Sequence, residues 1–213
     1  MKKTLETTQI KFWKSKFGDE YLSRHEIDFD DMYRNTWGIS RTELNLKFLS
    51  RLNRDSRILE VGCSSGKQLE LLRKIGFKNL WGIDINATAL TQAKQIPDTN
   101  IVYGSVLDIP FKDGYFDIVF TSCVLIHIHP HDLPHAIDEI YHVSRRYIWG
   151  FEYYSPSCTP LKYRGYNQKL WKNDFASLFL ARFPQLKLIK TQPIKYLIDD
   201  NIDKMYMLKK NAS

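Results

Sequence analysis

The chain has 213 residues, of which 43% are hydrophobic and 26% charged, with a formal net charge of +7. This length suits one domain with an arm, and the composition is typical of a globular protein. No run approaches the roughly eighteen apolar residues of a membrane-spanning helix, and the polar N-terminus lacks the apolar segment of a signal peptide. Three widely spaced cysteines exclude a disulfide framework. We therefore expect a cytoplasmic protein with no membrane partner.

The basic charge is spread along the chain, which favours a solvated surface over a nucleic-acid site. The first fifty residues read as two helices joined by a loop. Phe12, Trp13, Phe17 and Tyr21 lie at helical spacing in the first helix, and the second helix covers about 41–52. We expect residues 1–52 to form a helical arm or lid on a main domain at residues 53–213.

From Arg57 onward, predicted strands and helices alternate. The strands are predicted at 57–61, 80–84, 100–103, 116–122, 146–153, 186–192 and 203–209, and the helices at 66–76, 86–95, 132–144 and 170–182. Short strand–helix connections predict a mostly parallel sheet with helices on both faces. The last two strands are too close in sequence for a parallel crossover, so they should form an antiparallel hairpin. The prediction is an α/β, Rossmann-like, seven-stranded sheet whose last strand is antiparallel.

A glycine-containing turn follows the first of these strands. The strand carries Glu60 and runs into the segment 62–66, Gly-Cys-Ser-Ser-Gly, which is how α/β proteins bring a backbone close to a nucleotide. The next strand ends in Asp84, whose carboxylate can accept hydrogen bonds from both ribose hydroxyls. Glu60 would repel a pyrophosphate, and the glycine spacing is not G-x-G-x-x-G. Both features disfavour a nicotinamide-dependent oxidoreductase.

Together with Glu60, the turn resembles the E-x-G-x-G-x-G motif of class I methyltransferases, with Ser64 in place of the middle glycine. The segment 104–119 resembles the family's adenine-binding loop and fourth strand, with Ser105 where many relatives have aspartate. Residues 123–127 match the family's loop that closes over the cofactor. The resemblance covers residues 57–130 and implies S-adenosylmethionine as the cofactor, with the methionine part at Glu60 and the glycine turn, and the ribose at Asp84. We expect these cofactor-binding residues: Tyr21, Arg24, Trp37, Glu60, Gly62, Cys63, Ser64, Gly66, Asp84, Ile85, Ser105, Val106, Leu107 and Cys123.

Two groups in the arm contribute to that set. Tyr21 and Arg24 lie three residues apart, on one face of the first predicted helix, and could close over the cofactor. A packing helix with a surface arginine is the alternative. Residues 35–37, which include Trp37, are predicted in the loop between the arm helices, where they could line the mouth of the site or form an ordinary turn.

Three further segments, 12–24, 124–134 and 152–176, resemble the methylases associated with pseudaminic acid biosynthesis. This narrower resemblance implies a small-molecule methyltransferase of surface-glycan or related secondary metabolism. It does not identify the acceptor.

The candidate catalytic residues are His127, Tyr153, Tyr163 and Arg164. His127 could act as a general base or orient the acceptor, or it could be a structural histidine. Tyr153 follows the fifth strand, at the rim where open α/β sheets bind ligands. Arg164, next to Tyr163, could bind a carboxylate or phosphate with two hydrogen bonds, or it could be solvated.

His127 belongs to a cluster with His129, His131 and His135. Imidazoles are common metal ligands, but no cysteine or carboxylate at ligand spacing joins them, so we predict no metal site.

The sequence predicts methyl transfer to an oxygen or nitrogen atom of a small, anionic sugar-like or amino metabolite. It does not predict the oligomeric state. Two alternatives stay open: an RNA or protein methyltransferase, suggested by the basic charge, and a non-catalytic S-adenosylmethionine-binding subunit that regulates a partner.

Overall fold

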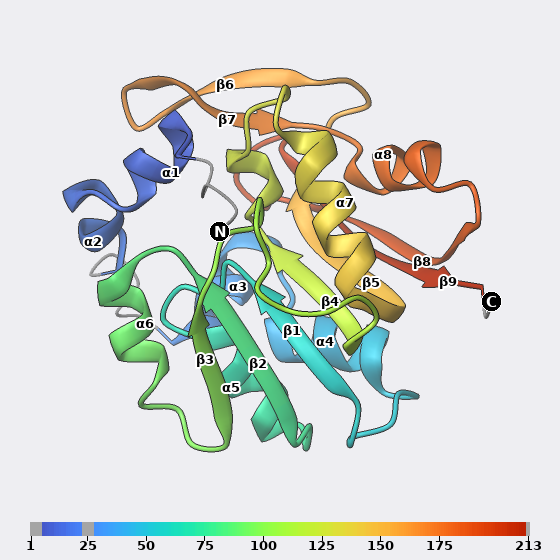
Figure 1. Cartoon of the computed structure of the whole chain (residues 1–213). Coiled ribbons are helices and arrows are strands. Elements are labelled where there is room, and N and C mark those ends of the chain that lie inside the picture. Colours follow the sequence, from blue (N-terminus) through green and yellow to red (C-terminus); the bar gives the residue numbers. More distant parts are fainter. Residues whose placement is uncertain (1–5, 23–27, 212–213) are drawn as a thin grey trace.

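The computed structural model describes residues 6–22 and 28–211 and is dominated by one seven-stranded sheet (Figure 1). Its strands are β1 (Arg57–Val61), β2 (Asn79–Asp84), β3 (Thr99–Tyr103), β4 (Phe116–Ser122), β5 (Ser144–Tyr153), β8 (Leu186–Lys195) and β9 (Ile202–Lys210), in the order β3-β2-β1-β4-β5-β9-β8. Strands β1 to β5 are parallel, and β9 runs antiparallel to both β5 and β8. The predicted sheet, its reversed last strand and its C-terminal hairpin are confirmed.

Helices cover both faces of the sheet. They are α1 (Thr8–Trp13), α2 (Lys16–Leu22), α3 (Phe29–Trp37), α4 (Arg41–Leu49), α5 (Lys67–Lys74), α6 (Ala87–Ala93), the short 3₁₀ helix η1 (Leu125–His127), α7 (Leu133–Val143) and α8 (Phe175–Arg182). Helices α7 and α8 pack on one face, and α3, α4 and α5 pack on the other. None of the helices in the described ranges is long and apolar enough to cross a membrane.

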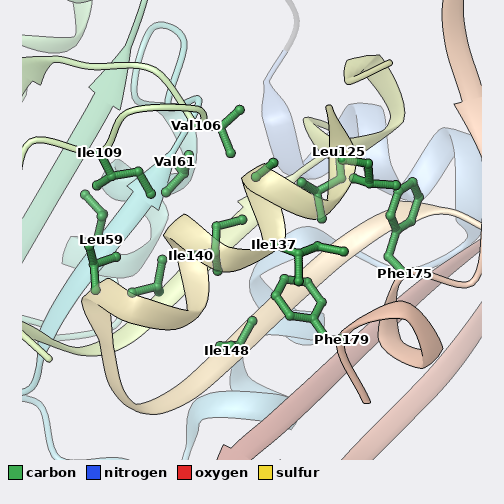
Figure 2. Close-up of a cluster of buried hydrophobic side chains, with 14 of the residues drawn as sticks. Leu59, Val61, Val106, Ile109, Leu125, Ile137, Ile140, Ile148, Phe175 and Phe179 are labelled. Atoms are coloured by element: carbon green, nitrogen blue, oxygen red, sulfur yellow. The ribbon is translucent and has the colours of Figure 1, made fainter. Parts of the chain in front are cut away.

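The core under α7 shows how the amphipathic pattern fixes the layers (Figure 2). Ile137 and Ile140 lie on one face of α7 and pack over the sheet, where Ile148 of β5 is buried, and Phe179 of α8 joins the same cluster. All four are at most 3% exposed. Full burial of such a side chain contributes about 1.5–3 kcal/mol, so this face anchors the helices to the sheet.

The N-terminal arm differs from the prediction in two places. The first predicted helix is divided into α1 and α2. Residues 35–37, predicted as a loop, lie in α3. This helix begins after Asp28, whose Oδ1 accepts from the backbone N–H groups of Asp30 and Asp31, and it ends at Gly38, at φ +71°. An N-cap aspartate and a left-handed glycine are ordinary helix boundaries, and the sequence prediction overlooked both.

An antiparallel hairpin, β6 (Thr159–Tyr163) and β7 (Tyr166–Lys172), was not predicted and lies beyond the carboxyl ends of β4 and β5 (Figure 1). Its turn places Arg164 and Gly165 at φ +48° and +90°. The helix predicted at 170–182 therefore begins only after Asp174, which caps α8. Arg182, in the last turn of α8, is exposed and paired with Asp138.

Candidate active site

The turn after β1 is held in a left-handed conformation. Gly62, Ser64 and Gly66 have φ values of +74°, +48° and +78°. The N–H groups of Gly62 and Cys63 both donate to the Ile83 carbonyl, at 2.8 and 2.9 Å. A Cβ atom on Gly62 would lie 2.6 Å from Cγ2 of Val124, in the loop after β4. Position 62 therefore requires glycine both for its dihedral angle and for the close approach of the two loops.

Asp84, at the carboxyl end of β2, braces this turn. Its Oδ2 accepts from the Ser64 N–H and its Oδ1 accepts from the Asn86 N–H, each at 2.8 Å. Burial raises the pKa of Asp84, and the backbone N–H groups of Asn86, Ser64 and Ile85 act in the opposite direction. A carboxylate has about four lone-pair sites, so Asp84 keeps room for a further hydrogen bond from a hydroxyl group.

A cavity opens where the loops after β1, β2, β3 and β4 meet. Ten of the predicted residues line it: Tyr21, Gly62, Ser64, Asp84, Ile85, Ser105, Val106, Leu107, Cys123 and His127. Its charged or titratable walls include Asp84, Asp132, His127 and His129, and much of the remaining wall is apolar. An apolar slot beside a carboxylate suits a purine with its ribose, so the residues present fit the nucleoside part of S-adenosylmethionine.

Four of the other predicted cofactor residues, Trp37, Glu60, Cys63 and Gly66, lie outside that lining. Cys63 is buried beneath the turn, and Gly66 is the N-cap of α5. Trp37 packs against Tyr33, at 4.4 Å between ring centroids, and against Tyr196, at 5.1 Å. Arg24 lies outside the described residues.

Glu60 is also beneath the turn rather than in the cavity lining. It is 3% exposed, and its Oε2 has no hydrogen-bond partner among the described residues. Burial raises its pKa well above the ordinary value, an effect that the buried Arg41 opposes. A role for Glu60 in holding the methionine part stays a prediction.

His127 is the one predicted catalytic residue in the lining. Its Nδ1 lies 2.7 Å from the Lys169 carbonyl oxygen. Because a carbonyl only accepts, Nδ1 carries the proton and Nε2 has a lone pair. Burial lowers the pKa of His127 to about 4, so the ring is neutral at physiological pH. The rings of Trp13 and Tyr163 contact it edge to face, with centroids at 4.6 and 4.9 Å.

The remaining members of the histidine cluster have separate partners. His129 lies 5.3 Å from the Trp171 ring, His131 contacts Asp132, and the Nε2 atom of His135 lies 2.9 Å from the Leu107 carbonyl oxygen. Within residues 6–22 and 28–211, no three His, Cys, Asp or Glu side chains are grouped to hold a metal ion.

The other catalytic candidates lie beside the cavity or away from it. Tyr153 and Tyr163 are half-buried at its border, within electrostatic reach of the Tyr21 hydroxyl. Arg164 is exposed at the turn of the β6–β7 hairpin and does not line the cavity.

Sequence reasoning missed Asn86, which ties the arm to the cavity. Its Nδ2 donates to the Trp13 carbonyl at 3.1 Å and to Oδ1 of Asp19 at 3.0 Å, while its Oδ1 accepts from the Ala89 N–H. That Asn86 caps α6 could be predicted from the sequence, because asparagine is a common N-cap. Its hydrogen bond to Trp13, 73 positions away, could not.

Aromatic side chains close the contact between the arm and the hairpin. Phe17 lies 5.9 Å from Tyr163 and 5.5 Å from Tyr166, and Phe12 lies 5.0 Å from Tyr166 (ring centroids). Helices α1 and α2 and the β6–β7 hairpin are therefore packed against each other beside the cavity.

Comparisons with known proteins agree with this geometry. Residues 59–146 match the family model described as a methyltransferase domain. A putative methyltransferase of Encephalitozoon cuniculi is 25% identical over 116 residues, which are 54% of this chain and 50% of that protein. An uncharacterized methyltransferase of Synechocystis is 32% identical over 90 residues, 42% of each chain. The alignments thus span about half the length of these relatives, or less.

The fold is shared with solved structures. The magnesium protoporphyrin IX methyltransferase of Synechocystis, solved with bound SAH, has a TM-score of 0.71 at 13% identity, over 94% of this chain and 97% of that one. Residues 59–146 therefore match a methyltransferase domain, on a fold that a solved methyltransferase structure shares. The expected enzyme class and cofactor are confirmed, whereas the narrower resemblance to pseudaminic acid-associated methylases stays a prediction.

Proposed function

We propose that the chain transfers a methyl group from S-adenosylmethionine to an oxygen or nitrogen atom of a small sugar-like or amino metabolite. The observation that supports it most is Asp84, which braces the turn after β1 through the Ser64 N–H and keeps acceptor capacity for a hydroxyl group. In the proposal, Asp84 binds the ribose, while Val106 and Leu107 pack against the adenine.

S-adenosylmethionine, when bound, supplies a methyl group already activated by the positive charge on sulfur. The protein's main task is then alignment, which can contribute about 7–11 kcal/mol. His127 is held by the Lys169 carbonyl so that its Nε2 lone pair can accept a hydrogen bond from the acceptor. Trp13 and Tyr163, which both contact the ring, would exclude water from that bond.

Helices α1 and α2 are proposed as a lid, whereas α3 and α4, also within the predicted arm of residues 1–52, pack against the sheet. Asn86 fastens the Trp13 carbonyl next to the cavity, and the aromatic contacts between α1, α2 and β7 close the other side. A small acceptor fits this enclosure better than a folded RNA or protein would. An acidic group on the acceptor would meet Arg164 only at the exposed hairpin turn.

A methyl-transfer screen with radiolabelled S-adenosylmethionine tests the proposal. The panel contains nucleotide sugars, sialic-acid-like sugars, amino sugars and small amines, with ribosomal RNA and ribosomal protein as competing acceptors. Label on a small metabolite supports the proposal. Label confined to RNA or protein would replace the acceptor class, and cofactor binding without transfer to any of them would support a regulatory subunit.

A further inference from the structure

We propose that Asp203 is the proton acceptor of this methyl transfer, reached from the acceptor through the hydroxyl groups of Tyr153 and Tyr196. The inference rests on the proposed function and adds the fate of the proton. It follows from a buried carboxylate, assigned no role above, beside the aromatic border of the cavity.

The three residues lie next to one another across β5, β9 and the β8–β9 turn. Tyr153 pairs with Asp203 in the β5–β9 register. The Tyr196 hydroxyl donates to Oδ1 of Asp203 at 3.5 Å, and the rings of Tyr153 and Tyr196 meet edge to face at 6.4 Å. Burial raises the pKa of Tyr153, and a hydrogen bond with Tyr196 partly offsets this. Since a hydroxyl both donates and accepts, two tyrosines can form a continuous path.

The path begins at the cavity wall. Cys123 lines the cavity, and its N–H donates to the Phe151 carbonyl at 2.8 Å, which places it beside the end of β5. Tyr21 also lines the cavity, and its pKa is raised by electrostatic interactions with Tyr163, Cys123 and Tyr153. An acceptor between Tyr21 and Cys123 would therefore lie close to the Tyr153 hydroxyl.

Asp203 has the capacity that a proton acceptor needs. It is 1% exposed; its Oδ1 accepts from Tyr196, and its Oδ2 has no partner at full hydrogen-bonding distance among the described residues, although the nearby Trp37 side chain lowers its pKa. Glu152, the neighbouring buried carboxylate, is already occupied. It accepts from the backbone N–H groups of Val124, Leu125 and Ile126 at 3.2–3.4 Å, which indicates a structural role.

His127 does not fill this role because its low pKa, about 4, makes it a poor proton acceptor near neutral pH. Burial raises the pKa of Asp203 to about 7, where a carboxylate can accept and return a proton. Several neighbouring elements act on the pKa of Asp203. The side chains of Tyr196, Lys172 and Trp37 lower it, and the Glu152 carboxylate raises it. Cys123 and Tyr33 also interact with Asp203 electrostatically.

The step balances without a further reactant. The acceptor's oxygen or nitrogen atom forms its bond to the methyl carbon as the carbon–sulfur bond breaks, and sulfur keeps that electron pair. The acceptor's proton passes to Tyr153, the Tyr153 proton to Tyr196, and the Tyr196 proton to Asp203. A sulfonium and a carboxylate become a thioether and a carboxylic acid.

The first test needs no acceptor. Protein labelled with ¹³C at the aspartate side-chain carboxyl groups is titrated by NMR from about pH 5 to about pH 9 with saturating SAH. We expect one resonance, absent from Asp203→Asn, to titrate with a midpoint near 7. Tyr196→Phe should shift that midpoint. A midpoint below about 5, or one that Tyr196→Phe leaves unchanged, would overturn the proposal.

The second test uses the panel acceptor that is methylated fastest. The kcat/KM of the wild type should rise with pH and level off above about pH 7. In Asp203→Asn and Tyr196→Phe, kcat/KM should be about 100-fold lower and should no longer rise with pH in this range. Tyr206→Phe is the control: it removes a tyrosine hydroxyl that is buried in β9 and has no partner among the described residues, and its profile should match the wild type.

SAH calorimetry separates the two proposals. If the wild type does not bind SAH, the proposed function fails. If Asp203→Asn binds SAH like the wild type and keeps the wild-type pH profile, only the proton path fails.

Discussion

Two halves of the active site are held together in different ways. The cofactor half, formed by the loops after β1 to β4, is fixed by backbone groups: the Gly62 and Cys63 N–H groups on the Ile83 carbonyl, and the Ser64 N–H on Asp84. The acceptor half, formed by α1, α2, the β6–β7 hairpin and the β8–β9 turn, is held largely by aromatic packing. A tightly packed backbone turn has no room for an added side-chain atom, so a single substitution there disrupts the site. Aromatic clusters lose contacts by degrees, so the two halves should respond differently to substitution.

The largest effect is expected in the cofactor half, from Gly62→Ala. The new Cβ would meet Val124 at 2.6 Å, at a φ of +74° that disfavours alanine. SAH affinity should fall by about 3 kcal/mol, roughly 100-fold, by calorimetry. The matched control is Gly114→Ala, at φ +62° with nothing within 4 Å of the new atom. An equal loss of affinity in both variants would mean that strain, not the cradle, is decisive.

Asp84→Ala should follow, with a loss of about 1–3 kcal/mol in SAH binding because a buried charged hydrogen-bond partner is removed. The control is Asp55→Ala, an exposed carboxylate in a surface pair with Lys78, which should leave binding unchanged. Wild-type affinity in Asp84→Ala would show that the ribose lies elsewhere.

The boundary between the halves has its own pH signature, at His127. The folded protein keeps this ring neutral down to about pH 4, whereas the unfolded chain takes up the proton near 6.5. The neutral ring therefore contributes stability above pH 6.5 that is lost as pH falls toward 4. Between about pH 7 and about pH 5, the wild type should lose about 2 kcal/mol more unfolding free energy than His127→Gln in urea titrations. Parallel curves for the two proteins would contradict the assigned burial.

The smallest effect is expected in the acceptor half, from Tyr166→Ala. It removes the edge contacts to Phe12 and Phe17, each worth about 0.5–1.5 kcal/mol, and should speed SAH dissociation several-fold in stopped-flow measurements. Tyr141→Ala, on α7, instead removes a stacked contact with Phe183, just after α8; it should lower Tm without changing that rate. If both variants leave dissociation unchanged, the arm is not a lid.

The same contrast explains what the sequence could predict. The positions of Gly62, Ser64 and Asp84 follow from contiguous motifs, because a strand, a turn and a helix are local and each has its own residue pattern. Tyr196 and Asp203 reach Tyr153 only through the pairing of β5, β9 and β8, which no local pattern encodes. The β6–β7 hairpin was missed because its turn uses Arg164 in a left-handed conformation, where turn rules favour glycine or asparagine. In α3 the signals were present, at Asp28 and Gly38, and were overlooked.

Calorimetry of the wild-type protein with S-adenosylmethionine, SAH and NAD tests the central claim most directly, because the cofactor half was assigned from Asp84 and the glycine turn. We predict saturable binding of the first two at one site per chain and no binding of NAD. Binding of NAD, or of none of the three, would contradict the assignment.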